Sequence, residues 1–453
     1  MVRKKKIKLS TTQIILLSFL VTILVGSVLL ALPISSANGE AVPYLDALFT
    51  ATTSTCVTGL VTLPTVSTWS VFGQIVILIL IQVGGLGIIT IMSGLMLLLN
   101  KKMGISDRLL IQDAFNLNTM SGLAKFVKNV LFGTLIIEVI GAIMYMFVFV
   151  PEFGAKGVWI SVFNSVSAFC NAGIDIIAEN SLCNYATNPL INIATSSLII
   201  LGGLGYIVWW DVLRVLKSRS KKNRKIFKYL TLHSKIAITV TVGLILFGAI
   251  FIFIFEYSNP LTIGKMSLFD KIQVSFFQSV TTRTAGFATI PQENMTNASA
   301  TVSIILMMIG GSPVGTAGGI KTVTIAILVC SAFATIRNKK VVTLFGRRIL
   351  EESIKKAIAV VVMFLAICVI SAILLMATSN VSVIDAVYET VSATATVGLS
   401  RNLTATLNTV GKLIIIVTMY FGRVGPISLA VAFGSKNESQ NVISEPTEDI
   451  SIG

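Results

Sequence analysis

Four short segments of this sequence share a pattern of small and hydroxyl-bearing residues that leads to a glycine. They read DALFTATTSTCVTGL, ISVFNSVSAFCNAGI, QVSFFQSVTTRTAGF and DAVYETVSATATVGL, and their glycines are Gly59, Gly173, Gly286 and Gly398. Successive glycines are 114, 113 and 112 residues apart, which indicates fourfold internal duplication. An aromatic residue stands ten positions before each glycine, at Phe49, Phe163, Phe276 and Tyr388.

The pattern predicts a short helix followed by a non-helical loop. At membrane depth such a backbone is tolerated only where it is buried in protein or lines a water-filled path. Four loops around one axis would present a ring of carbonyl oxygens, which can replace the hydration shell of a monovalent cation. Glycine is needed because a filter loop uses backbone angles that a Cβ atom would penalise. Thr396, Val397 and Gly398 also match the first three residues of the TVGYG loop of potassium channels.

The predicted carbonyl donors are the residues that lead up to each glycine. They are Cys56, Val57, Thr58 and Gly59 in the first loop, Cys170, Asn171, Ala172 and Gly173 in the second, Thr284, Ala285 and Gly286 in the third, and Ala395, Thr396, Val397 and Gly398 in the fourth.

A different reading makes the four segments extracellular amphipathic helices that end in glycine caps. The four matched copies disfavour it, because three of them carry no charge in the residues before the glycine. The exception is Arg283, whose charge would repel a cation if it faced the path. We therefore expect Arg283 to point behind its loop and to pair with an acid such as Glu389 or Asp175.

The composition places these loops in a polytopic membrane protein. Of 453 residues, 54% are hydrophobic and 12% charged, and the mean hydropathy is +0.87. Eight apolar runs are long enough to span a bilayer, at residues 14–32, 71–99, 127–150, 189–212, 236–255, 302–333, 357–377 and 410–433. The second and sixth runs exceed the bilayer thickness, which demands tilt, a kink or projection into water.

The basic residues predict the orientation of the chain in the membrane. The net charge of +15 is concentrated before residue 9 and in the loops at 101–128, 214–235 and 337–356, all on one side of the eight runs. The positive-inside rule makes this side, with both termini, cytoplasmic. On the other side of the membrane acidic residues outnumber basic ones. This excess fits a vestibule that attracts cations, but the positive-inside bias leaves the same excess in any inner-membrane protein.

These observations predict an all-α polytopic membrane protein with four pseudo-repeats of span, pore helix, filter loop and span around one central pore. The expected divisions are a basic cytoplasmic N-terminus at 1–13, repeats at 14–100, 127–217, 235–337 and 355–434, and a cytoplasmic tail at 435–453.

The second span of each repeat carries a glycine motif, and those of the third and fourth repeats are unusual. The third contains GGSPVGTAGG, through which no helix runs well. We predict a mobile intramembrane loop at residues 310–320, just below the filter, that gates the path; a static kink is the alternative. Its gate residues are Gly310, Gly311, Ser312, Pro313, Gly315, Thr316, Gly318 and Gly319.

Two isolated charges lie inside predicted spans. In the fourth repeat Arg423 replaces a glycine, and an intramembrane arginine is by default a functional residue. It would act as an electrostatic barrier or hold the intramembrane loop closed, unless it merely pairs with a buried acid. Glu138 is expected to make a structural hydrogen bond to a neighbouring helix rather than to relay protons.

The residues above resemble the Trk/Ktr/HKT superfamily of potassium transporters, and most of all the bacterial Ktr membrane subunit. Four single-glycine loops, VTTRTAGF, TVGL, two GGLG motifs and the glycine-rich intramembrane loop carry the resemblance over nearly the whole chain. It implies potassium uptake, often sodium-dependent, by a homodimer in the bacterial plasma membrane. It also implies a cytosolic ring of nucleotide-binding regulatory subunits of the RCK type. The proline in GGSPVGTAGG departs from the family's pattern.

Other functions find less support in the sequence. The sequence has one histidine and no zinc-binding or nucleotide-binding motif, so it indicates neither an enzyme active site nor a site for a metal cofactor or a nucleotide. Nothing in it indicates that the protein binds nucleic acid. A proton-coupled carrier would need an intramembrane relay, for which only Glu138 and Asp211 are available. The remaining alternative is a poorly selective channel for sodium and potassium on the same fold. The cytoplasmic lysines fit contact with a partner or with membrane lipids.

Overall fold

The computed structural model describes residues 10–99, 104–114, 122–217, 226–339 and 341–425, and almost every element in it is a helix. The basic residues before position 10, the end of the predicted fourth repeat at 426–434 and the predicted tail at 435–453 lie outside the described residues.

Each repeat begins with a long apolar helix followed by a short one. The long helices are α1 (Thr11–Ala31), α7 (Leu123–Phe153), α12 (Leu232–Glu256) and α16 (Glu351–Thr378), and each is long and apolar enough to cross a membrane. The short helices, called pore helices below, are α2 (Tyr44–Cys56), α8 (Ala155–Cys170), α13 (Leu268–Thr281) and α17 (Val383–Ala395). Ser267 and Ser382 cap α13 and α17 by accepting hydrogen bonds from amides in the first turn.

At least three of the four second spans are not continuous helices. The first two bend by 94° between α4 (Val71–Leu86) and α5 (Ile88–Leu98), and between α9 (Pro189–Leu204) and α10 (Tyr206–Lys217). The bends occur at Gly87 and Gly205, whose φ angles of +85° and +87° favour glycine. The third is broken between α14 (Asn297–Met308) and α15 (Thr322–Ile336), and α18 (Thr409–Val424) represents the fourth.

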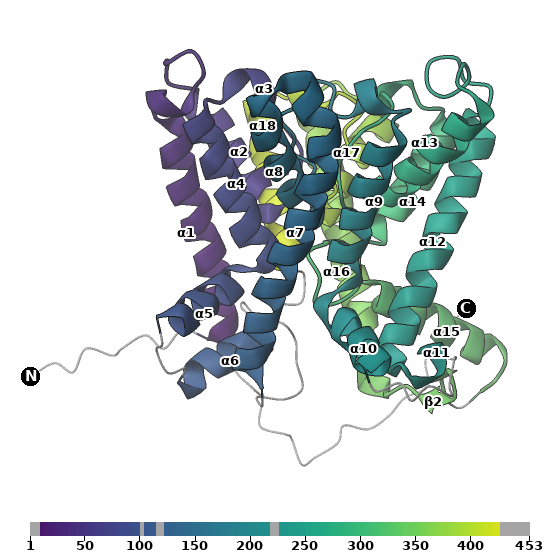
Figure 1. The fold of residues 1–453 in the computed structure, drawn as a ribbon. Helices are drawn as coiled ribbons and strands as arrows, with labels where there is room; N and C mark the ends of the chain where they lie inside the picture. Colours follow the sequence, from purple (N-terminus) through teal and green to yellow (C-terminus); the bar gives the residue numbers. More distant parts are fainter. Residues whose placement is uncertain (1–9, 100–103, 115–121, 218–225, 340, 426–453) are drawn as a thin grey trace, which may run out of the picture.

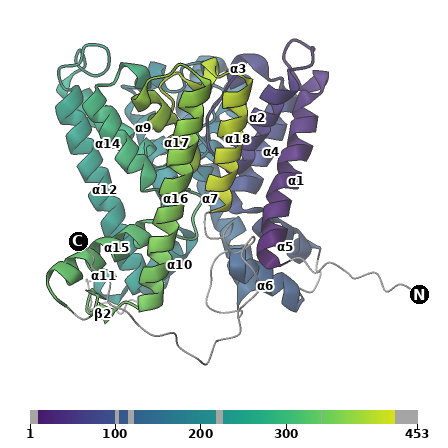
Figure 2. The same cartoon turned by 180° about the vertical axis from the view of Figure 1, so that it is seen from behind.

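The four repeats close into a ring. Each pore helix packs on the long helix of its own repeat, and each second helix also packs on the pore helix of the next repeat. The pairs between repeats are α4 with α8, α9 with α13, α14 with α17 and, closing the circle, α18 with α2. Figure 2 shows α14, α16, α17 and α18 between α12 and α1. The ring places repeats 1 and 3 opposite each other, and likewise repeats 2 and 4.

Smaller elements mark the two faces of the ring. The helices α5, α6 (Ile105–Ala114), α10 and α11 (Ile226–Tyr229) lie on the face where α1 begins, together with a hairpin of β1 (Thr343–Leu344) and β2 (Arg347–Arg348) (Figure 1). On the opposite face lies α3 (Thr65–Thr68). Single 3-10 turns occur at η1 (Pro33–Ser35), η2 (Cys183–Tyr185), η3 (Gln292–Asn294) and η4 (Thr404–Thr406).

A buried carboxylate anchors the C-terminal end of α12 in the third repeat. Glu256, the last residue of α12, is 0% exposed. It accepts hydrogen bonds from the Thr296 amide (2.9 Å) and hydroxyl (2.8 Å), from the Thr262 hydroxyl (2.6 Å) and from the Asn259 amide (2.7 Å). Since Thr296 caps α14, this carboxylate joins α12 to the start of the next helix.

We expect Glu256→Gln to lower the thermal stability of the protein. The amide replaces one accepting oxygen with a donor, which leaves buried donors unpaired at a cost of about 1.5–3 kcal/mol. Thermal unfolding in detergent measures the change, with Glu352→Gln as the control. Glu352 makes an exposed ion pair with Lys356 (2.7 Å), of a kind worth about 0–1 kcal/mol. Equal midpoints for the two variants would contradict the assigned role of Glu256.

Candidate ion-binding site

Three of the four loops begin with the same backbone turn. The pore helices α2, α8 and α17 end at Cys56, Cys170 and Ala395, and the next residue of each loop adopts the left-handed conformation. These residues are Val57, Asn171 and Thr396, with φ angles of 55°, 59° and 54°. This residue, two positions before the glycine, redirects the chain out of the helix. The partial negative charge of each helix C-terminus therefore lies close to the loop, where it favours a cation.

The third loop differs from the others by a shift of its helix. Helix α13 ends at Thr281, five residues before Gly286, and the left-handed residue is Thr284 (φ 66°). The buried aromatic is correspondingly Phe277 rather than Phe276, which the glycine alignment matched with Phe49, Phe163 and Tyr388. Phe277 is 0% exposed and Phe276 is 38% exposed.

The four aligned glycines form a closed ring. A Cβ atom built on each would lie within 2.3–2.5 Å of the carbonyl oxygen that precedes the glycine of the next loop. The clashes run from Gly59 to Ala172, from Gly173 to Ala285, from Gly286 to Val397 and from Gly398 to Thr58. The φ angles of the four glycines are 101°, 64°, 81° and 95°. Both the contacts and the backbone angles therefore require residues without a side chain.

Hydroxyl groups fix the loops to their own pore helices. The Gly59 amide donates to the Thr53 hydroxyl (2.9 Å), and the Gly398 amide donates to the Ser392 hydroxyl (3.1 Å). In the second loop the Ile174 amide donates to the Ser167 hydroxyl (3.2 Å). The third loop uses Thr281, whose hydroxyl donates to the Phe287 carbonyl (2.7 Å). Within the described chain the buried hydroxyls of Thr58, Thr284 and Thr396 have no hydrogen-bond partner.

A cavity of about 460 Å³ lies on one side of the ring and reaches all four glycines. The residues two positions after each glycine also line it, namely Val61, Asp175, Ala288 and Ser400. Its charged lining residues among those described are acidic: Asp175, Glu179 and Glu293. An acidic cavity that opens onto a ring of carbonyl groups raises the local concentration of cations at its entrance.

The intramembrane loop contacts the second and fourth repeats on the other side of the ring. Its Thr316 hydroxyl donates to the Phe169 carbonyl of the second repeat (3.1 Å). A Cβ on Gly318 would lie 2.1 Å from the Thr396 hydroxyl and 2.6 Å from the Ala395 carbonyl of the fourth repeat. Repeats 2 and 4 are the two neighbours of repeat 3 in the ring, so the loop, which belongs to repeat 3, contacts the end of a pore helix on each side of it. These contacts are made before the glycines, on the side of the ring away from the cavity.

Backbone hydrogen bonds hold the intramembrane loop against the bend between α9 and α10. The amides of Ser312 and Thr316 donate to the carbonyls of Gly203 (2.8 Å) and Gly202 (3.1 Å), and the Tyr206 amide donates to the Val314 carbonyl (2.9 Å). Pro313 and Gly315 pack at the same bend: the Pro313 carbonyl lies 2.4 Å from a Cβ on Gly205, and a Cβ on Gly315 would lie 2.8 Å from the Gly202 carbonyl. At the ends of the loop Gly310 donates to Ile320 (3.0 Å), and Gly311 accepts from the Thr322 amide (3.0 Å). Gly319 has a φ of 65°.

Arg423 connects the intramembrane loop to the first and fourth repeats. One of its terminal nitrogens donates to the Thr316 carbonyl (2.7 Å). The other donates to the carbonyls of Gly84 and Gly85, the latter at 3.3 Å. Arg423 makes no ion pair with any described acid, so the reading that it merely pairs with a buried carboxylate is wrong.

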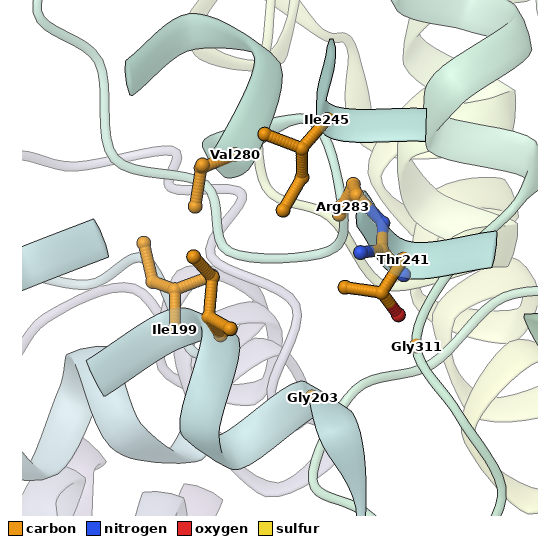
Figure 3. A pocket seen from close by; sticks show the side chains of 8 residues that line it. Ile199, Gly203, Thr241, Ile245, Val280, Arg283 and Gly311 are labelled. Atoms are coloured by element: carbon orange, nitrogen blue, oxygen red, sulfur yellow. The ribbon is translucent and has the colours of Figure 1, made fainter. Parts of the chain in front are cut away.

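The expected acid partner of Arg283 is also wrong. The Arg283 side chain lies beside Thr241 and Gly311 (Figure 3). Its terminal nitrogen donates to the Gly310 carbonyl (2.9 Å), at the start of the intramembrane loop. Glu389 instead accepts from the hydroxyls of Ser400 (2.7 Å) and Thr404, and Asp175 accepts from the Ile177 amide (3.4 Å). A backbone carbonyl can accept a hydrogen bond from a buried guanidinium, which reasoning from charge pairs alone overlooks.

Two further polar residues belong to this region. Gln82 on α4 donates to Glu138 (3.3 Å), which confirms a structural hydrogen bond between helices for that glutamate. Lys321, which the sequence analysis missed, donates to the Ala317 carbonyl of the intramembrane loop (2.6 Å). The sequence does contain a signal for Lys321, because a lysine inside the apolar run 302–333 is unusual.

Comparison with known proteins gives consistent matches over the whole chain. The profile of a family described as TrkH, cation transport protein, matches residues 3–445. The chain is 39% identical to the potassium/sodium uptake protein NtpJ of Enterococcus hirae, with 100% of both chains covered. It is 39% identical to the Ktr system potassium uptake protein B of Bacillus subtilis, covering 97% of this chain and 96% of that protein. The crystal structure of the potassium transporter TrkH from Vibrio parahaemolyticus has the same fold, with a TM-score of 0.76 at 16% identity over 95% of this chain and 86% of that one.

Proposed function

The chain belongs to the TrkH family of cation transport proteins, and from this we propose that it takes up potassium across the plasma membrane through the ring of Gly59, Gly173, Gly286 and Gly398. It is thus a multi-pass membrane transporter rather than an enzyme. The observation that carries the proposal is the ring itself, in which each glycine lies against the carbonyl of the next loop. A ring of carbonyls replaces the water that a potassium ion loses when it enters.

The intramembrane loop supplies the gate in this proposal. In the closed state it lies across the path below the ring, where its bonds to Arg423 and to the bend at Gly205 hold it. Opening then requires the loop to move away from the carbonyl of Phe169 in the second repeat and from that of Ala395 in the fourth. Arg423 combines two effects: it holds the loop through Thr316, and its positive charge below the filter repels a cation.

A poorly selective channel for sodium and potassium is the second candidate. One relative is named a potassium/sodium uptake protein. The four loops share only their glycine, and the residues before it are Thr58, Ala172, Ala285 and Val397. Unequal loops give unequal carbonyl positions, which lowers the discrimination between ions of different size.

The wider assembly follows from the family. We propose a homodimer in membrane lipid, with both termini cytoplasmic and with uptake that depends on sodium. The name of one relative, Ktr system potassium uptake protein B, describes a component of a system. The proposed second component is a cytosolic ring of RCK-type subunits that bind a nucleotide, since this sequence has no nucleotide motif of its own.

Uptake by cells that lack their own potassium transport tests the proposed function. We expect cells that express the chain to take up potassium saturably from low external concentrations, and to do so faster when sodium is present. Equal rates for potassium and sodium would favour the poorly selective channel. No uptake of either ion by cells that hold the protein in the membrane would contradict both candidates.

A further inference from the structure

Arg283 occupies a position that is small in the other three repeats. It stands three residues before the filter glycine, where the other loops have Cys56, Cys170 and Ala395. It is 6% exposed and makes no ion pair with a described acid. Among the described residues, its side chain donates one hydrogen bond, to the Gly310 carbonyl (2.9 Å). The third filter loop therefore reaches the intramembrane loop through a side chain.

Gly310 is the point where the two ends of the intramembrane loop meet. Its amide donates to the Ile320 carbonyl (3.0 Å), and the Ile320 amide donates to the Met308 carbonyl (3.0 Å). A Cβ on Gly310 would lie 2.0 Å from the Gly318 carbonyl, so the far end of the loop packs on this residue. A bond to the Gly310 carbonyl thus acts on both ends of the loop at once.

The other repeats join the filter to the second helix in a different way. Their equivalent glycines, Gly84, Gly202 and Gly422, lie directly against carbonyls of their own pore helices: a Cβ would be 1.9, 2.0 and 2.1 Å from the oxygens of Thr55, Phe169 and Thr394. Such contacts between backbones can be lost only if the helices themselves move apart. In the third repeat the equivalent glycine faces its own loop instead, and the link to the filter is a hydrogen bond that can break and form again.

The surroundings of Arg283 suit a bond that breaks. Its Nε has no hydrogen-bond partner in the described chain, and neither has the hydroxyl of Thr241 on α12. Both residues line a cavity of about 10 Å³, together with Ile199, Ile245, Val280 and Gly311 (Figure 3). This volume is at the lower limit for one water molecule. A water there would keep the guanidinium partly hydrogen-bonded after the loop withdraws.

We propose that Arg283 is a positioning residue that couples the third filter loop to the gate, by holding the Gly310 carbonyl when the intramembrane loop lies across the path. The inference rests on the proposed function. It adds a second contact that stabilises the closed loop, beside the bond of Arg423 to Thr316. A charge-assisted hydrogen bond at this depth stabilises the closed position without touching the ion. Its loss therefore changes how often the path is open, and leaves the preference for one ion over another intact.

Ion flux into vesicles tests this inference. The full-length chain is reconstituted without any other protein, and entry of rubidium and of sodium is measured for wild type, Arg283→Gln, Arg283→Lys and Thr289→Val. We expect Arg283→Gln to raise rubidium flux about tenfold or more, since a hydrogen bond to a charged group is lost. Arg283→Lys keeps a charged donor and should raise it less. Thr289→Val removes a buried hydroxyl that has no partner in the described chain and does not line this cavity, so it should leave the flux unchanged.

The ratio of rubidium to sodium flux separates coupling from simple damage. Raised flux with an unchanged ratio supports the inference. Wild-type flux in both Arg283 variants, reduced flux from well-folded protein, or a collapsed ratio would overturn it. If Arg283→Gln yields no folded protein, Arg283→Lys decides by the same criteria. A wild-type chain that conducts no rubidium in vesicles and takes up no potassium in cells contradicts the proposed function, whereas a conducting wild type with indifferent Arg283 variants overturns this inference alone.

Discussion

Gly398→Ser is expected to weaken potassium transport by roughly five- to a hundredfold and to reduce the preference for potassium over sodium. The new Cβ would lie 2.3 Å from the Thr58 carbonyl and 2.8 Å from the Gly59 Cα, so the first and fourth loops must separate. Overpacking of this kind costs about 1–3 kcal/mol. Here the strain would displace the carbonyl groups that we propose bind the ion. Potassium uptake in transport-deficient cells, with sodium uptake measured in parallel, gives both quantities.

Gly39→Ser is the matched control for Gly398→Ser. Gly39 also has a positive φ, of 73°, so serine is similarly strained there, but nothing lies within 4 Å of its Cβ position. We expect normal transport from this variant. If Gly398→Ser transports potassium as well as Gly39→Ser does, then Gly398 is not part of the ion-binding ring.

Arg423→Gln is expected to raise ion flux through the protein by about ten- to a hundredfold when no partner protein is present. The substitution removes the charged hydrogen bonds to the carbonyls of Thr316, Gly84 and Gly85, each of a type worth about 1.5–3 kcal/mol. It also removes the positive charge below the filter. Rubidium flux into vesicles that contain only this chain measures the change. Flux at or below the wild-type level, with folded protein present, would contradict the proposed role of Arg423 in the gate.

Arg423→Lys separates the two roles proposed for Arg423. Lysine keeps the charge but cannot reproduce the planar fork that contacts Thr316 and Gly84 together. If Arg423 acts mainly by holding the intramembrane loop, the flux of this variant rises toward that of Arg423→Gln. If it acts mainly as an electrostatic barrier, the flux stays near the wild-type level.

The repeat, the pore helices and the non-helical filter loops could be predicted from the sequence, because their signals are local. An even spacing of glycines and a run of uncharged residues before Gly59 and Gly398 need no knowledge of the fold. The third loop shows the limit of this method. Aligning it on Gly286 paired Phe276 with the buried aromatics, whereas the shifted helix buries Phe277.

Features that depend on contacts between repeats could not be read from the sequence. The bends at Gly87 and Gly205 fall within apolar runs that look continuous, since hydropathy does not record direction. The sequence also does not show which repeats are neighbours in the ring, so it could not give the contacts of the intramembrane loop with the second and fourth repeats. The partner of Arg283 was missed for a related reason: any backbone carbonyl can accept its bond, and carbonyls leave no trace in a sequence.

Locating a bound ion tests the ring of carbonyls most directly. Crystals of the full-length protein grown in rubidium salt would show the ion by its anomalous scattering. We predict a peak on the axis of the ring, between the loops that end at Gly59, Gly173, Gly286 and Gly398, which is lost in Gly398→Ser. Well-ordered filter loops without a peak between them, or with peaks only elsewhere in the protein, would contradict the account.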